Sequence, residues 1–296
     1  MARWLSVRRT QENLFDHLLA IRGFTAKDLE DNYGEIHNPN TLPDIDRAVD
    51  LIIEAKTQGY SAAIFGDYDA DGTPGAAVLS ILLDQLKIPH QVFIPTREKG
   101  YGLKKEAIDA LDPNTKLLIT VDNGIKAVEE IKYAHEKGMK VLVLDHHLPG
   151  DELPEADALV DTFVKKSKYP FNGLCGCALA YKLTVALEEK VPELNKNLSK
   201  WFLDLVAIST VADMMPPVDE NRQLVKFGLK VLGKSRWPGV KALLAAAKVE
   251  PKNLNETTLG FVLGPRLNAT GRMGDNQPAL DLLLSKDASS AAKLAW

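Results

Sequence analysis

The feature that most constrains the fold is a short apolar run, residues 62–65, that leads into three aspartates at alternate positions. The run has the length of a buried strand, and the aspartates are Asp67, Asp69 and Asp71. Gly72 permits a sharp turn, and apolar residues recur at helical spacing in 76–86. Residues i and i+2 of an extended segment point the same way, so Asp67 and Asp69 are expected to converge. Carboxylates this close repel unless a cation lies among them, which predicts half of a divalent-metal site.

Two simpler interpretations compete for this stretch. Aspartates before a glycine are frequent turn formers. The pattern also matches the start of a calcium-binding EF-hand loop, but that loop needs a glutamate at its twelfth position, where this chain has Val78, and a preceding helix. Calcium is therefore disfavoured, and a plain turn remains the alternative.

Beyond residue 60, strand-like and helix-like segments alternate, which is typical of an α/β fold with a parallel sheet. The expected strands are 62–66, 91–94, 117–121, 140–144 and 157–160. The expected helices are 74–87, 104–110, 125–137 and 176–189. In such sheets the ligand site lies beyond the carboxyl ends of the strands.

Acidic and histidine side chains follow those strand ends. Strand 117–121 runs into Asp122, and strand 140–144 runs into Asp145, His146 and His147. One such residue is often only a helix cap. Three such strand ends in one sheet are expected to surround a common crevice. The side chains placed there are those of Asp67, Asp69, Asp122 and His146. This carboxylate and imidazole set suits Mn²⁺ or Mg²⁺.

Asp213 is a further candidate. It ends an apolar helical segment that Pro216 and Pro217 terminate. The helix dipole disfavours a carboxylate at this end, and a nearby cation would remove the conflict. The alternative is a solvent-exposed aspartate.

Two segments carry residues suited to phosphate or bases. The basic segment 97–105 includes Tyr101 and Gly102, and it is either a phosphate- or base-contacting loop or a solvated one. Segment 264–275 combines Arg266, Asn268 and Arg272 with three glycines, which predicts a loop that contacts phosphate.

The composition fits one large or two ordinary globular domains, with 296 residues and 45% apolar content. No run approaches the roughly 20 apolar residues that span a bilayer, so we expect no membrane association. The net charge of −4 neither favours nor excludes a polyanionic ligand. The only cysteines, Cys175 and Cys177, are too close for an ordinary disulfide framework, which favours a reducing, cytoplasmic location.

These motifs, in this order, resemble those of the DHH phosphoesterase superfamily. Residues 100–103, 176–178 and 266–275 resemble its RecJ branch of single-strand-specific exonucleases. The resemblance implies a parallel-sheet domain with helices on both faces, followed by a helical C-terminal connector. The expected divisions are a helical segment (1–60) packed on the core, a catalytic domain (61–232) and a connector (233–296) that stops before a DHH-associated domain. Pro74 stands where RecJ-like proteins usually carry Thr or Ser; as the first helical residue after a Thr73 cap it would be tolerated.

The resemblance also implies the roles of individual residues. Two Mn²⁺ or Mg²⁺ ions would be held by Asp67, Asp69, Asp122, His146 and Asp213, with Asp122 bridging and Asp145 a further candidate ligand. His147 would face the scissile phosphate, and Asp71 would support the ligands. Substrate contacts would come from Tyr101, Gly102, Arg266, Asn268 and Arg272, of which both arginines would also serve catalysis.

The implied activity is metal-dependent hydrolysis of single-stranded DNA from an end, 5′ to 3′, releasing mononucleotides in DNA repair or recombination. Single-strand-binding and helicase proteins would be partners. The alternatives are a phosphodiesterase or pyrophosphatase acting on small nucleotides, and a catalytically silent DHH scaffold. Comparing long strands with dinucleotides tests the first alternative, and titration with manganese tests the second.

Overall fold

The computed structural model describes residues 11, 13–96, 100, 102–272, 274 and 276–295, with backbone only at residues 28 and 272. Contacts divide the chain into two units, Met1–Gly34 and Glu35–Trp296. The smaller unit contains α1 (Leu14–Ile21), whose first turn is capped by the side chain of Asn13. Helix α2 (Ile45–Gln58) belongs to the larger unit, where it packs on the sheet.

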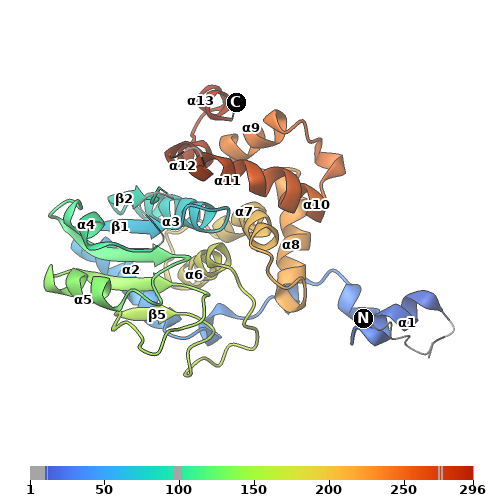
Figure 1. Ribbon diagram of the computed structural model, residues 1–296, viewed down its shortest axis with the longest axis horizontal. Coiled ribbons are helices and arrows are strands. Elements are labelled where there is room, and N and C mark those ends of the chain that lie inside the picture. Colours follow the sequence, from blue (N-terminus) through green and yellow to red (C-terminus); the bar gives the residue numbers. More distant parts are fainter. Residues whose placement is uncertain are drawn as a thin grey trace, which may run out of the picture. The chain divides into compact units, whose positions relative to one another are not determined.

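The larger unit is built on a sheet of five parallel strands in the order β2-β1-β3-β4-β5 (Figure 1). The strands are β1 (Ser61–Gly66), β2 (His90–Phe93), β3 (Thr115–Val121), β4 (Lys140–Leu144) and β5 (Ala158–Val160). All five were predicted from the sequence. The strand order reverses between β1 and β3, and at such a point the carboxyl ends of the strands flank a crevice.

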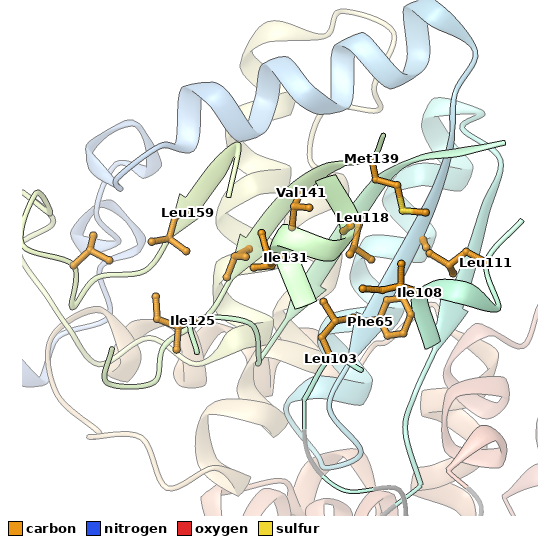
Figure 2. Packing of buried hydrophobic residues seen from close by; sticks show 14 residues of the cluster. Phe65, Leu103, Ile108, Leu111, Leu118, Ile125, Ile131, Met139, Val141 and Leu159 are labelled. Atoms are coloured by element: carbon orange, nitrogen blue, oxygen red, sulfur yellow. The ribbon is translucent and has the colours of Figure 1, made fainter. Parts of the chain in front are cut away.

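Helices cover both faces of this sheet, as predicted. Helices α4 (Lys105–Asp109) and α5 (Val128–Glu136) lie on one face, where Ile108 and Ile131 join Phe65, Leu118 and Val141 in one apolar cluster (Figure 2). Helices α2, α3 (Gly72–Leu86) and α6 (Gly176–Lys190) pack on the other. A sheet buried on both faces explains why the strands read as continuous apolar runs.

Helix α3 begins two residues earlier than predicted. Asp71 immediately precedes it, so Thr73 is not its cap and Pro74 is its third residue. An N–H at that position would have no partner within the helix, so proline is tolerated. The close approach of Gly72 to the backbone of Asp67 fixes this start, since a Cβ on Gly72 would lie 2.3–2.6 Å from it.

The rest of the larger unit is helical. After α6 come α7 (Leu198–Ala212), α8 (Asp219–Leu232), α9 (Pro238–Ala246), α10 (Glu256–Thr258), the π-helical turn η6 (Leu259–Leu263), α11 (Gly264–Arg272), α12 (Gln277–Leu284) and α13 (Ala288–Leu294). This agrees with the predicted helical C-terminal region. Within the described part of the chain, no helix has the length and apolar character needed to span a bilayer.

The glycine-rich segment 264–275 was predicted as a loop, and this prediction was wrong for residues 264–272, which form α11. The buried side chains of Leu263 and Leu267 hold the helix against the protein. Its glycines serve close packing: a Cβ on Gly264 would lie 2.8 Å from that of Ala212. A Cβ on Gly271 would lie 2.4 Å from Asn276 Oδ1.

Candidate metal centre

Asp67 and Asp69 follow β1 and converge as the sequence predicted. Each offers an oxygen to a group completed by Asp122, in which all ligand atoms lie within 4.8 Å of one another. Asp69 Oδ1 also accepts hydrogen bonds from the N–H groups of Asp71 (2.8 Å) and Gly72 (3.0 Å), which shape the turn into α3.

Asp122 lies directly after β3 in a left-handed backbone conformation, with φ of 62°. Aspartate tolerates this region better than most residues. The N–H of Asp122 donates to the carbonyl of Leu144, so the turn stays tied to the end of β4. Gly176, the first residue of α6, packs directly against Asp122, where a Cβ would lie 2.7 Å from its Cβ. The absence of a side chain on Gly176 therefore makes room for Asp122.

His146 joins carboxylates from three elements. Its Nε2 lies 2.9 Å from Asp122 Oδ1, 3.6 Å from Asp71 Oδ2 and 3.6 Å from Asp213 Oδ2. Asp213 is the C-cap residue of α7, as the sequence suggested, and its side chain is 28% exposed. Residues that lie far apart in the sequence therefore meet at one edge of the sheet.

The protein alone does not stabilise the fully ionised form of this cluster. Burial, reinforced by repulsion from Asp69, raises the pKa of Asp67 to about 7. Burial and the charges of Asp71 and Asp69 raise the pKa of Asp213 to about 7. The pKa of Asp122 is raised well above its usual value, first by burial and then by Asp71.

Two carboxylate oxygens of the cluster indicate a site for a cation. Asp67 Oδ1 and Asp213 Oδ2 are buried, and the described residues provide neither with a hydrogen-bond donor. A divalent cation would satisfy both oxygens and cancel the repulsion between the carboxylates. The residues present therefore fit a metal centre of the Mn²⁺ or Mg²⁺ type.

Asp145 differs from Asp67 and Asp213 because donors occupy both of its oxygens. Oδ1 accepts from His147 Nδ1 (2.7 Å) and from the N–H of His146 (2.8 Å), and Oδ2 accepts from the N–H of Ile125 (2.8 Å). Burial alone would raise its pKa, but the hydrogen bond and charge of His147 lower it overall. In turn, Asp145 raises the pKa of His147. Asp145 is thus placed to orient His147.

Asp71 connects the cluster to α6. Its Oδ2 accepts from the N–H of Gly176 (2.6 Å) and its Oδ1 from the N–H of Cys177 (2.9 Å). A carboxylate at a helix N-terminus is favourable, so this contact fixes α6 beside the metal ligands. The supporting role expected of Asp71 has this physical basis.

The family model described as "DHH family, N-terminal domain" matches residues 61–210. The chain belongs to the DHH family. It is similar to the single-stranded-DNA-specific exonuclease RecJ of Bacillus subtilis (strain 168), with 38% identity over 285 residues that cover 94% of this chain and 35% of the relative.

Solved structures give the same comparison. A crystal structure of exonuclease RecJ bound to manganese matches with a TM-score of 0.79 and 34% identity, over 86% of this chain and 64% of that one. A structure of RecJ from Thermus thermophilus in complex with Mg²⁺ matches with a TM-score of 0.69 and 29% identity, over 95% of this chain and 37% of that one. The chain spans about a third to a half of the length of the RecJ relatives in these sequence comparisons.

The structure describes only some of the residues predicted to contact the substrate. Tyr101 lies outside the described residues, as does the side chain of Arg272. Gly102 lines a hollow of about 170 Å³ together with His147. Arg266 is exposed, and its Nη1 donates to the carbonyl of Val262 (2.8 Å). Asn268 Oδ1 is buried with no donor in the described structure.

Helix α11 nevertheless lies beside the first aspartate motif. A Cβ on Gly271 would lie 3.4 Å from the carbonyl oxygen of Tyr68. The C-terminal end of α11, at Gly271, therefore lies close to the backbone between Asp67 and Asp69.

Sequence reasoning missed Asp161, which directly follows β5. It is fully buried, and its Oδ1 accepts from the N–H of Phe163 (2.7 Å). Burial raises its pKa to about 7. Its position after a strand is the same signal that identified Asp67 and Asp122, so the rule would have found it. No comparable signal marked Phe163, Phe171 or Lys126, which border the centre.

Proposed function

We propose that this DHH chain hydrolyses phosphodiester bonds of single-stranded DNA from an end, 5′ to 3′, and releases mononucleotides. The observation that carries the proposal is a set of adjoining ligand groups: Asp67 and Asp69 meet Asp122, and His146 lies close to both Asp122 and Asp213. The names of the RecJ relatives supply the substrate, and the manganese- and magnesium-bound RecJ structures supply the class of ion.

We infer that two Mn²⁺ or Mg²⁺ ions are held by Asp67, Asp69, Asp122, His146 and Asp213. Asp122 belongs both to the group with Asp67 and Asp69 and to the group with His146 and His147, which supports its role as the shared ligand. When bound, such a pair of ions lowers the pKa of water and compensates the negative charge of a phosphate.

His147 is the side chain best placed to act on the phosphate itself. Its Nδ1 lies 2.7 Å from Asp145 Oδ1, and its side chain is 41% exposed beside the candidate metal ligands. Because Asp145 raises the pKa of His147, the imidazolium form persists closer to neutral pH. His147 therefore donates a hydrogen bond to an oxygen of the scissile phosphate, and its positive charge stabilises that oxygen. Asp145 acts through His147 as a positioning residue.

The remaining contacts of the strand come from both sides of the centre. Arg266, Asn268 and Arg272 on α11 would hold phosphates, which the packing of α11 beside Tyr68 supports. Tyr101 and Gly102 would contact the strand beside His147. A cytoplasmic role in DNA repair or recombination, with single-strand-binding or helicase proteins as partners, follows from the likeness to RecJ.

The test is a nuclease assay on single strands labelled at the 5′ or the 3′ end, with and without manganese. We expect manganese-dependent release of 5′-terminal mononucleotides. Asp122→Asn should abolish release while circular dichroism shows an intact fold, and the exposed Asp151→Asn is the matched control. Hydrolysis that persists in Asp122→Asn would refute the metal assignment. Cleavage of dinucleotides but not of long strands would refute the substrate class in favour of a small-nucleotide phosphodiesterase.

A further inference from the structure

A groove of about 780 Å³ opens beside the metal centre. His146, His147 and Asp213 form part of its lining. The remainder, which we call the aromatic groove, includes Leu148, Phe163, Phe171, Met215, Pro216 and Lys126. Leu148 is 65% exposed and Phe163 37% exposed. Its size is that of an ordinary ligand site, and it presents apolar surface directly next to a centre suited to phosphate.

Local contacts fix the backbone of Phe163 and the ring of Phe171. The N–H of Phe163 donates to Asp161, which is fully buried after β5. The ring of Phe171 and the side chain of Pro216 pack against Gly173. A Cβ on Gly173 would lie only 2.4 Å from Phe171 Cζ and 2.7 Å from Pro216 Cγ. Gly173 thus lets the ring and Pro216 approach each other, and both aromatic residues are pre-positioned.

Asn221 ties together the two loops that form one wall. This fully buried side chain donates from Nδ2 to the carbonyls of Gly173 (2.6 Å) and Pro216 (3.1 Å). The next residue towards the N-terminus, Glu220, forms a buried ion pair with Lys182 of α6 (2.6 Å). The wall is therefore anchored to α6 and α8, which reduces the ordering cost of binding a ligand.

The groove also carries positive charge where a strand would need it. Lys126 is exposed at the rim and forms no ion pair within the described ranges of the chain. It also lines the smaller hollow that His147 borders, together with Lys104. Two lysines therefore flank the path of an anionic backbone past His147.

We propose that the aromatic groove binds a base of the DNA strand whose neighbouring phosphate lies at the metal centre. Phe163 and Phe171 contact the face of the base, and Lys126 pairs with the next phosphate. Aromatic side chains accept every base in this way, so the subsite gives affinity without sequence preference. This assignment rests on the proposed function, since a phosphate at the centre sets where the base falls.

The test is a double-mutant cycle between protein and substrate. The probe is a thymidine oligonucleotide with phosphorothioate linkages, which resist hydrolysis, in an intact and an abasic form and with manganese present. Phe163→Ala should weaken binding of the intact strand about 5- to 150-fold, the range expected for loss of one stacked base. The same variant should bind the abasic strand as wild type does, and Phe163→Tyr should retain wild-type affinity for both.

Phe261→Ala is the matched control, because Phe261 is 81% exposed and lies on η6, away from the lining of this groove. Equal weakening of intact and abasic strands by Phe163→Ala, or no weakening of either, would overturn the subsite. A lowered melting temperature combined with equal weakening would identify the groove as a packing surface instead. Hydrolysis of an unmodified strand by the wild-type protein is measured separately, so failure of the nuclease proposal is distinguished from failure of the subsite.

Discussion

Gly176→Ala tests how tightly α6 positions the metal ligands. A Cβ at residue 176 would lie 2.7 Å from Asp122 Cβ and 2.9 Å from its Cα, whereas ordinary contacts begin at 3.4 Å. To reach ordinary contact, the backbone at residue 176 or at Asp122 would have to move by about 0.7 Å. Because the N–H of Gly176 also donates to Asp71, the movement disturbs two carboxylates of the cluster.

The expected cost follows from this displacement. Adding a methyl group to a filled interior costs about 1 to 3 kcal/mol, which for a chain of this size lowers the melting temperature by roughly 2 to 12 °C. Displacing a catalytic group by about 1 Å costs on the order of a hundredfold in rate. For the smaller shift we expect a loss of about tenfold or more in manganese-dependent hydrolysis.

The assay compares hydrolysis rates and melting temperatures of Gly176→Ala, Gly150→Ala and wild type. Gly150 is the control because the nearest atom to an added Cβ lies 3.8 Å away, so Gly150→Ala should behave as wild type. Wild-type activity and stability in Gly176→Ala would show that α6 does not constrain Asp122.

Three further predictions address buried charges. Burial raises the pKa of Asp204 to about 7 from 3.8; the resulting stabilisation is complete below about pH 4 and is lost as the pH rises through about 7. Asp204→Asn removes this pH dependence. The unfolding free energy of Asp204→Asn minus that of wild type should therefore rise by up to about 4 kcal/mol between pH 4 and pH 8. If urea titrations give the same difference at every pH in this range, the raised pKa of Asp204 is contradicted. Lys182→Met leaves Glu220 buried without its cation, so the unfolding free energy should fall by about 3 to 5 kcal/mol. Much of this loss should be recovered in Lys182→Met/Glu220→Leu. If the losses of the two single substitutions simply add in the double variant, the ion pair is not what couples these residues. Asp145→Asn removes the negative charge that helps to raise the pKa of His147, so the alkaline fall of kcat should move to lower pH. An unmoved pH profile would show that Asp145 does not control the protonation of His147.

The strand-end residues were predictable from sequence because a parallel sheet brings the carboxyl ends of its strands to one edge. That rule placed Asp67, Asp122 and His146 together without knowledge of the strand order. Asp213 was identified from the helix dipole alone. Its distance from His146 depends on how α7 packs, which no local pattern specifies.

Other features depend on tertiary contacts that leave little trace in the sequence. Glycines in α11 suggested a loop, but in the structure they make room for Ala212 and Asn276. Asp122 packs so closely against Gly176, in a distant part of the chain, that a side chain on residue 176 would collide with it. The aromatic groove arises where two irregular segments meet, so neither Phe163 nor Phe171 belonged to a periodic pattern.

The wide spacing of the cluster along the chain has a consequence for biosynthesis. The ribosome releases Asp67 and Asp69 first, Asp122 and His146 next, and Asp213 last. Chains fold progressively from the N-terminus, yet pairing of distant strands is slow. A nascent polypeptide therefore holds only part of this cluster until α7 has emerged, so the candidate site is completed late, when most of the larger unit is already made.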